Sequence, residues 1–226
     1  LNDTPLYYLD YSWTMYKPYS EDLSCDEVKR IELMGESAIR AYRRVISIFK
    51  SSKPGLFMLM GDYGSGKTLI VRKATAGLSS GRVVVKSLKS INPDSDLSCS
   101  GGRAIMGYVI DNFELFFQNP GEYAELARDY VISISQYYPV LLVVSLPLII
   151  GDISGYGDIV NRIGEIPESN KIRVSFTPEE TRGILSRLGI SINEHVKPYI
   201  LKTPGLGIRA LSPSKRNDDA VEIIII

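Results

Sequence analysis

Five short apolar runs, separated by segments with helical spacing, dominate the pattern of hydrophobic positions along the chain. Strands that alternate with helical segments are typical of an α/β domain with a mostly parallel sheet and crossover helices. We therefore expect five strands flanked by helices. The runs that we expect to form them are Leu56–Met60, Val83–Ser87, Ile105–Ile110, Val140–Ser145 and Lys171–Phe176.

The segments between these runs differ in what they can form. Apolar positions within Asp26–Lys50 follow helical spacing loosely, and Glu122–Tyr137 is also helix-like. Only about seventeen residues join the second and third runs. They include Ile91–Gly102, which is rich in Asn, Pro, Asp, Ser and Gly. We expect no full crossover helix there.

A change of pattern after the fifth run divides the chain. Thr177-Pro178-Glu179-Glu180 combines a cap, a proline in the first turn and a capping-box Glu, so it predicts the start of a helix. We expect a second helix after Ser191 and a third near Gly205. The predicted organisation is an aromatic arm over 1–24, an α/β domain over 25–176, and a small helical lid with an apolar tail over 177–226.

A phosphate-binding motif follows the first predicted strand. Residues 61–68 read Gly-Asp-Tyr-Gly-Ser-Gly-Lys-Thr, which matches GxxxxGK[ST] between a strand and a helical stretch. Its glycines let successive backbone N–H groups point at an anion, and the positive end of the next helix adds to the attraction. A glycine-rich turn with a surface lysine is the alternative. The residues that we predict to bind nucleotide are Gly61, Asp62, Tyr63, Gly64, Ser65, Gly66, Lys67, Thr68 and Leu69.

The phosphate loop and one other predicted strand supply the groups that a Mg²⁺–ATP complex needs. Lys67 would reach the β and γ phosphates, and Thr68 would offer its hydroxyl to Mg²⁺. Tyr108-Val109-Ile110-Asp111 is an apolar run that ends in a carboxylate, placed where a parallel strand would bring it beside the loop. We predict Thr68 and Asp111 as the metal-side residues, and ATP and Mg²⁺ as the cofactors.

The residue after Asp111 sets the expected rate of hydrolysis. Many ATPases of this layout have a Glu there, but this chain has Asn112, which can orient water yet cannot accept its proton. Glu114 lies two residues further on and is a second candidate. We therefore predict slow turnover, with the nucleotide acting as a switch of state.

Because of these motifs, residues 25–211 resemble an AAA+ ATPase of the replication-initiator group, which includes bacterial DnaA and the origin-recognition ATPases. Ile110-Asp111-Asn112-Phe113 is similar to the second motif of that group, and the segment 203–211 around Arg209 resembles its second sensor motif, Gly-x-x-Arg-x-Leu. The resemblance implies that Ser145 is a polar sensor, that Arg162 reaches a neighbouring subunit's ATP site, and that Arg209 contacts the γ-phosphate. A strand-ending serine and ordinary solvated arginines are the alternatives.

The same resemblance implies a function and its partners. It points to nucleotide-switched self-association in DNA replication initiation or a related DNA transaction, in a compact form without a C-terminal DNA-binding domain. DNA or DNA-bound proteins are the expected partners, besides ATP. Two alternatives stay open from the residues: a P-loop small-molecule kinase, and an ATP-binding module without turnover.

Composition narrows the picture further. The chain has 26 Lys+Arg and 26 Asp+Glu, which argues against nucleic-acid binding through bulk basicity, although residues 29–103 carry fourteen basic and five acidic residues. The longest apolar run, Tyr137–Ile150, is interrupted by prolines and too short for a bilayer crossing, so we expect no membrane partner. Cys25 and Cys99 stand far apart in the sequence, from which we expect reduced thiols and a cytoplasmic location.

Overall fold

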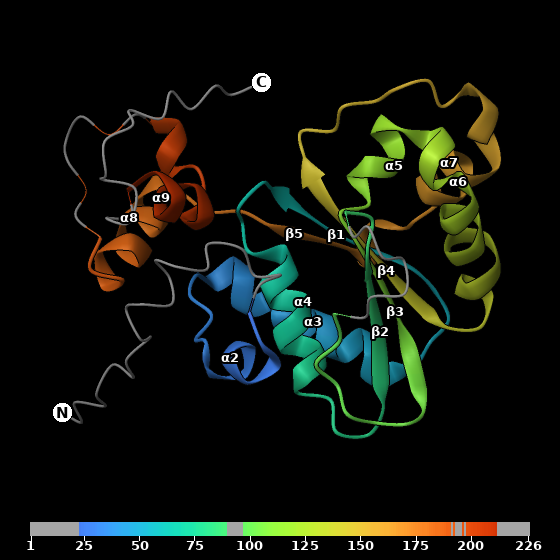
Figure 1. Cartoon of the computed structure of the whole chain (residues 1–226), viewed down its shortest axis with the longest axis horizontal. Coiled ribbons are helices and arrows are strands. Elements are labelled where there is room, and N and C mark those ends of the chain that lie inside the picture. Colours follow the sequence, from blue (N-terminus) through green and yellow to red (C-terminus); the bar gives the residue numbers. More distant parts are fainter. Residues whose placement is uncertain (1–22, 90–96, 191, 193–195, 197, 212–226) are drawn as a thin grey trace.

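A single parallel sheet with helices on both faces forms the body of the protein (Figure 1). The computed structural model describes residues 23–89, 97–190, 192, 196 and 198–211. The strand order is β2-β3-β4-β1-β5, and all four pairings are parallel. The expected α/β class is thus confirmed. The strands are β1 (Gly55–Asp62), β2 (Arg82–Ser87), β3 (Ile105–Asp111), β4 (Pro139–Leu146) and β5 (Lys171–Val174).

Alternating side chains along the strands divide the core into two layers. On β1, Phe57 and Leu59 face one layer and Leu56 and Met58 face the other, as the two-residue period of a strand requires. The first layer is covered by α3 (Glu36–Ser51) and α4 (Lys67–Ala76). The helices on the second layer are α5 (Glu114–Gln118), α6 (Pro120–Arg128), the π-helical η2 (Asp129–Ser133) and α7 (Gly157–Gly164).

Two expected helices are wrong in their extent. Asp26–Lys50 is not one helix but two, α2 (Cys25–Arg30) and α3, with a break at Gly35. Gly35 has a φ of 91°, and a Cβ there would lie 2.5 Å from the ring of Phe176, so the chain turns where only glycine fits. The expected helix Glu122–Tyr137 begins at Pro120 and ends in a 3₁₀ turn, η3 (Ile134–Gln136).

The short connection between β2 and β3 runs along the sheet edge. Its described part, 97–104, contains no helix, as we expected. The Leu97 N–H donates to the Val85 carbonyl at 2.9 Å, and the Val83 N–H donates to Ser100 Oγ at 3.0 Å. The segment thereby satisfies edge groups of β2 that would otherwise face solvent.

The expectation of two reduced cysteines is wrong, because Cys25 and Cys99 form a disulfide. Although 74 residues separate them in the sequence, their Cα atoms are 5.2 Å apart, since α2 and the segment after β2 both pack against α4. The buried Arg72 of α4 ties the same two segments, donating to the carbonyls of Leu23 at 2.7 Å and Leu97 at 3.3 Å. The cysteines therefore give no support to a reducing compartment.

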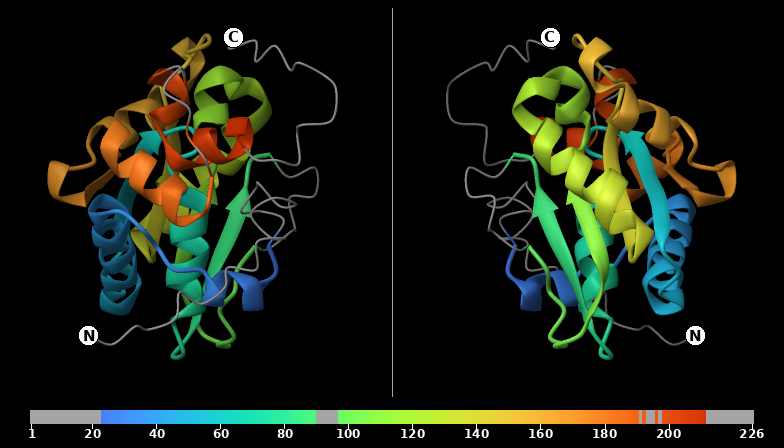
Figure 2. Two further views of the ribbon diagram at one scale, coloured as in Figure 1. Left: turned by 90° about the vertical axis from the view of Figure 1, so that its left-hand side faces the viewer. Right: turned by 90° about the vertical axis from the view of Figure 1, so that its right-hand side faces the viewer.

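The lid follows β5 and contains α8 (Pro178–Arg187), the 3₁₀ helix η6 (Pro198–Leu201) and α9 (Pro204–Leu211). It projects toward the viewer in the left panel of Figure 2, coloured orange to red. The expected capping box is present: Thr177 Oγ1 accepts from the Glu180 N–H at 3.1 Å, and Glu180 Oε2 accepts from the Thr177 N–H at 2.9 Å. The lid has its own small apolar core.

Three expectations concern parts of the chain that the structure does not describe. Of the aromatic arm 1–24, only Leu23 and Ser24 belong to the described residues. The helix expected after Ser191 falls in a region where only 192, 196 and 198–211 are described. The apolar tail lies outside the described residues. Within the described ranges, no helix has the length and apolar character that crossing a bilayer would require.

Candidate functional site

The predicted phosphate loop joins the end of β1 to the start of α4, at the carboxyl edge of the sheet. Gly64 and Gly66 have φ values of 79° and 80°, in the left-handed region that other residues avoid. The Ser65 N–H donates to the Asp62 carbonyl at 3.1 Å and closes the turn. Because Gly66 directly precedes Lys67, the loop opens onto the positive end of α4.

Lys67 is buried inside this loop, with 6% of its surface exposed. Its Nζ donates to the carbonyls of Gly61 and Asp62, each at 2.9 Å, and to Ser65 Oγ at 3.4 Å. Burial lowers the pKa of Lys67 from 10.5 to about 8, although the nearby carboxylates of Glu114, Asp111 and Asp62 favour its charged form. The loop thus presents a poorly hydrated cation whose present partners are neutral groups.

The side chains of Thr68 in α4 and Asp111 in β3 form a hydrogen bond. Thr68 Oγ1 in the first turn of α4 donates to Asp111 Oδ2 at 2.6 Å, and Asp111 is 2% exposed at the end of β3. β4 lies between β1 and β3 in the sheet. The backbone N–H of Asn112 donates to the second oxygen, Oδ1, at 2.9 Å and fixes the carboxylate.

The donor set at this point suits Mg²⁺. It offers one hydroxyl and one carboxylate, and Mg²⁺ usually takes one or two protein oxygens and completes its shell with water and phosphate oxygens. Within the described ranges, no cluster of three or more His, Cys, Asp or Glu side chains could hold a metal ion by itself. A Mg²⁺ ion held by Thr68 and Asp111 would therefore depend on a bound phosphate.

The other predicted residues at this edge lie on three neighbouring segments. Ser145 is paired with Gly61 in the β1/β4 register, and its N–H donates to Glu114 Oε2 at 3.0 Å. The buried Asn112 accepts from Ser87 Oγ at 2.8 Å through Oδ1. Ser145, Asn112 and Glu114 thus all lie at the carboxyl ends of β3 and β4, but they make different contacts.

The remaining predicted residues are two arginines and two residues of the loop and its helix. Arg162 on α7 forms an exposed ion pair at 3.3 Å with Glu165, the C-cap residue of that helix. Arg209 belongs to α9, but its side chain lies outside the described part of the structure. Tyr63 is 43% exposed, with Lys89 Nζ 5.7 Å from its ring centroid, and Leu69 in α4 is half-buried.

The lid touches the phosphate loop directly, which sequence reasoning missed. Thr203 Oγ1 donates to the Tyr63 carbonyl at 2.9 Å, and the Gly205 N–H donates to the Gly64 carbonyl at 3.0 Å. A Cβ at Gly205 would lie 2.6 Å from that same carbonyl oxygen, so the contact needs glycine. Lys202 Nζ also pairs with Asp62 Oδ1 at 3.0 Å.

A signal for this contact was present in the sequence, although its meaning was not evident. Thr203-Pro204-Gly205 has the cap and first-turn proline of a helix start, which placed α9 correctly. Nothing in the local pattern says that this helix start meets a loop about 140 residues earlier. That contact depends on the docking of the lid.

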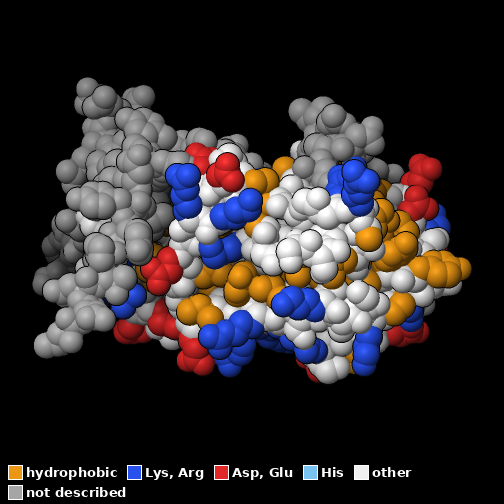
Figure 3. All heavy atoms as spheres, turned by 90° about the horizontal axis from the view of Figure 1, so that it is seen from below, with side chains coloured by type: hydrophobic (Ala, Val, Ile, Leu, Met, Phe, Trp, Pro, Cys, Tyr) orange, Lys and Arg blue, Asp and Glu red, His pale blue; other side chains and the backbone are white. Residues whose placement is uncertain are grey.

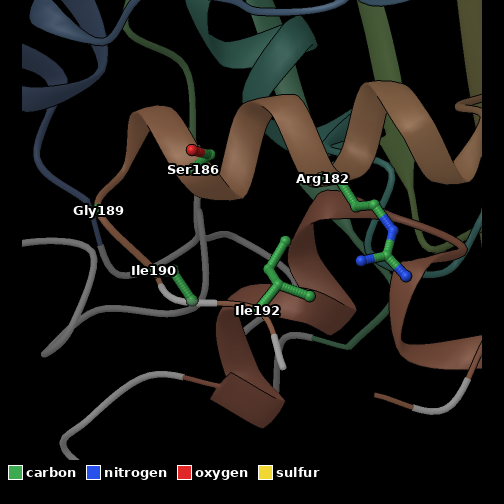
Figure 4. A pocket seen from close by; sticks show the side chains of 5 residues that line it. All are labelled: Arg182, Ser186, Gly189, Ile190 and Ile192. Atoms are coloured by element: carbon green, nitrogen blue, oxygen red, sulfur yellow. The ribbon is translucent and has the colours of Figure 1, made fainter. Parts of the chain in front are cut away.

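A hollow is also present on the lid. It has a volume of about 360 Å³ and is lined by α8 and the residues that follow it, as Figure 4 shows. The lining residues are Arg182, Ser186, Gly189, Ile190 and Ile192. None of the predicted site residues lines it, and Arg182 is its one charged group.

Comparisons with known proteins bear on the fold. No protein-family model matches the sequence, and no curated protein sequence matches it. Among solved structures, the chain is similar to AMPPCP-bound DnaA from Aquifex aeolicus, with 14% identity and a TM-score of 0.46 over 81% of this chain and 62% of that chain.

Two further structures are similar at the same level. One is Orc1 from Aeropyrum pernix in complex with DNA, with 18% identity and a TM-score of 0.45 over 77% of this chain and 55% of that chain. The other is NtrX from Brucella abortus in complex with ADP, with 17% identity and a TM-score of 0.45 over 86% and 54%. The chain spans less than two thirds of the length of each of these three structures.

The lowered pKa of Lys67 predicts a specific dependence of stability on pH. The folded protein releases this proton near pH 8 and the unfolded chain near 10.5, so between these values the unfolded chain binds more protons and stability rises with pH. Relative to Lys67→Met, the free energy of unfolding of the wild type should rise by about 2 kcal/mol between pH 7.5 and 10. Urea denaturation of both proteins across this range measures the difference, and a constant difference would contradict the prediction.

Proposed function

We propose that this chain is an AAA+-type ATPase that binds Mg²⁺–ATP at residues 61–69 and hydrolyses it slowly. The observation that carries the proposal is the joint placement of a left-handed glycine turn, a buried Lys67 and the Thr68–Asp111 pair at one edge of the sheet. In a purely structural turn, a buried lysine near three carboxylates would cost free energy without a function that requires it. A triphosphate fits both the amides and the charge.

Binding would exchange the present partners of Lys67 for phosphate oxygens. Its Nζ would leave the carbonyls of Gly61 and Asp62, and these neutral acceptors would give way to charged ones that form stronger hydrogen bonds. Thr68 and Asp111 would hold Mg²⁺, which supplies charge neutralisation on the phosphates. The loop amides and the start of α4 would orient the chain of phosphates.

Turnover should be slow because Asn112 stands directly after Asp111, where a carboxylate usually lies, so that any general base must act from another position. The Asn112 carboxamide cannot accept a proton, and its oxygen is already engaged by Ser87. The nucleotide state, rather than rapid cycling, would then be the output of the site. We expect turnover by the purified protein alone to stay below about 1 s⁻¹, at the low end for enzymes.

The lid offers a route from that site to the rest of the molecule. Because Thr203 and Gly205 bond to the carbonyls of Tyr63 and Gly64, any change in the loop on nucleotide binding must be matched by the lid or break these bonds. In the proposed switch, Ser145 and Arg209 report the γ-phosphate within the chain, and Arg162 reports it to a neighbouring subunit. The 43% exposure of the Arg162 side chain is compatible with such a contact.

The finer role that we propose is nucleotide-switched assembly in DNA replication initiation or a related DNA transaction. It is supported by the sequence resemblance around Asp111 and Arg209. On the face shown in Figure 3, Lys and Arg side chains are spread among apolar and acidic ones, not gathered into one stripe. Because the chain has 26 Lys+Arg and 26 Asp+Glu, we propose that DNA is engaged by an assembly or through DNA-bound proteins rather than through bulk basicity of a single chain.

Calorimetric titration tests the ATP-binding proposal. The wild type should bind ATP in the presence of Mg²⁺, and Lys67→Ala should weaken binding by more than tenfold, because each hydrogen bond to a charged group contributes about 1.5–3 kcal/mol. Chelation of Mg²⁺ should weaken wild-type binding as well. Lys50→Ala, at the exposed end of α3, is the matched control and should bind as the wild type does. Equal binding by the wild type and Lys67→Ala would refute a nucleotide site in this loop.

Light scattering after size exclusion tests the assembly proposal. A non-hydrolysable ATP analogue should shift the wild type to a larger species, and Arg162→Ala should stay small while its affinity for the analogue changes less than threefold. Arg40→Ala, an exposed arginine that also pairs within its own helix, serves as the control. A gel shift of labelled DNA at two salt concentrations on the same samples tests whether the assembly engages DNA. Assembly by Arg162→Ala would contradict the trans role, and phosphoryl transfer to a small acceptor would favour a kinase.

A further inference from the structure

Two polar residues follow Asp111 within three positions, and the structure turns them toward different neighbours. Asn112 adopts a left-handed backbone with a φ of 57°, which is uncommon outside glycine. Its Oδ1 accepts from Ser87 Oγ at the end of β2. Since β3 and β4 both lie between β2 and β1, the carboxamide oxygen of Asn112 is engaged on the side away from the phosphate loop.

Glu114 takes the opposite direction. It is the first residue of α5, it is 8% exposed, and its Oε2 accepts the Ser145 N–H at 3.0 Å. Ser145 pairs with Gly61 across β4 and β1, and the Gly61 carbonyl accepts Lys67 Nζ. This chain of neighbours places the Glu114 carboxylate at the phosphate loop.

The electrostatics of the loop agree with that placement. Of the carboxylates that favour the charged form of Lys67, Glu114 has the largest effect, ahead of Asp111 and Asp62. Glu114 therefore stabilises the charged form of Lys67 more than the other carboxylates do, although it lies 47 positions away in the sequence.

One oxygen of Glu114 is left for a further partner. Oε2 holds the Ser145 N–H, whereas none of the described residues donates a hydrogen bond to Oε1. Oε1 is not among the fully buried side-chain atoms of the described residues that lack a partner, so water can reach it. Oε1 is therefore the oxygen of Glu114 that is open to a water molecule.

From these contacts we propose that Glu114, rather than Asn112, is the general base of ATP hydrolysis at this site, an inference that rests on the proposed ATPase function. Glu114 would accept one proton from a water molecule as the water oxygen forms a bond to the γ-phosphorus. The bond from that phosphorus to the β–γ bridging oxygen breaks, and its electron pair leaves with ADP. The proton on Glu114 then returns to solvent.

The carboxylate chemistry decides between the two residues. A carboxylate oxygen can take up the proton that an attacking water loses, and a carboxamide cannot. The backbone N–H of Ser145 fixes the other oxygen and thereby orients the group. In this arrangement Ser145 acts through its main chain as a positioning residue.

Glu114→Gln tests the assignment, because it keeps the shape and the hydrogen-bond acceptor for Ser145 but removes the base. Turnover should fall by about 100-fold or more, the usual range for the loss of a general base. The affinity for Mg²⁺–ATP should change less than threefold, and nucleotide recovered from the variant after incubation should be ATP, where the wild type yields ADP. Glu125→Gln, an exposed glutamate on α6, is the matched control. Asn112→Ala should lose less turnover than Glu114→Gln.

The outcomes separate this inference from the function that it rests on. If the wild type binds no ATP, the proposed function itself fails. If the wild type hydrolyses ATP and Glu114→Gln loses less than tenfold, or loses ATP binding together with turnover, the general-base role is overturned while the ATP site stands. The role is also overturned if Asn112→Ala is the more damaged variant, or if wild-type turnover does not exceed that of Lys67→Ala.

Discussion

The hydrogen bond from Thr68 to Asp111 joins the first turn of α4 to the end of β3, and the candidate site depends on it. It holds α4, the helix after the phosphate loop, against the end of β3. In the sheet, β4 separates β3 from β1, the strand that leads into this loop. The bond also provides a hydrogen-bond partner for one oxygen of a carboxylate that is 2% exposed. If it were missing, the loop glycines and Lys67 would still form a turn for an anion, but nothing would place a metal beside it.

Around that bond, several charged side chains are buried close to one another. Lys67 is buried with carbonyl partners, and the carboxylates of Glu114, Asp111 and Asp62 counter the effect of burial on its pKa. Such a balance is costly in a purely structural turn and is typical of sites that bind a charged ligand. The lid contacts on Tyr63 and Gly64 place the same loop in contact with a second, separately packed unit.

The parts of the fold that the sequence predicted are those that local chemistry determines. Strand runs alternate between two buried layers, the glycine turn needs left-handed φ values at fixed positions, and Thr177 caps α8 through bonds within four residues. Each of these features is set by near neighbours in the chain. The contact of Thr68 with Asp111 then agrees with the expectation that a parallel strand brings Asp111 beside the loop.

The features that the sequence did not predict depend on contacts between distant segments. Cys25 and Cys99 looked isolated because their spacing carries no signal, and only the docking of two segments on α4 brings them together. At Gly35, where the two helices are separated, the ring of Phe176 leaves no room for a Cβ, and these two residues lie far apart in the sequence. The opposite directions of Asn112 and Glu114 come from a single left-handed residue at the end of β3, whereas a straight strand would have put both on one face.

The most direct measurement is a crystal structure with Mg²⁺ and a non-hydrolysable ATP analogue. The account predicts phosphate density enclosed by residues 61–68, with Lys67 moved from the Gly61 and Asp62 carbonyls onto phosphate oxygens and a Mg²⁺ ion beside Thr68 and Asp111. An empty loop in such crystals, or a nucleotide bound with Asp111 remote from its metal, would contradict the central claim.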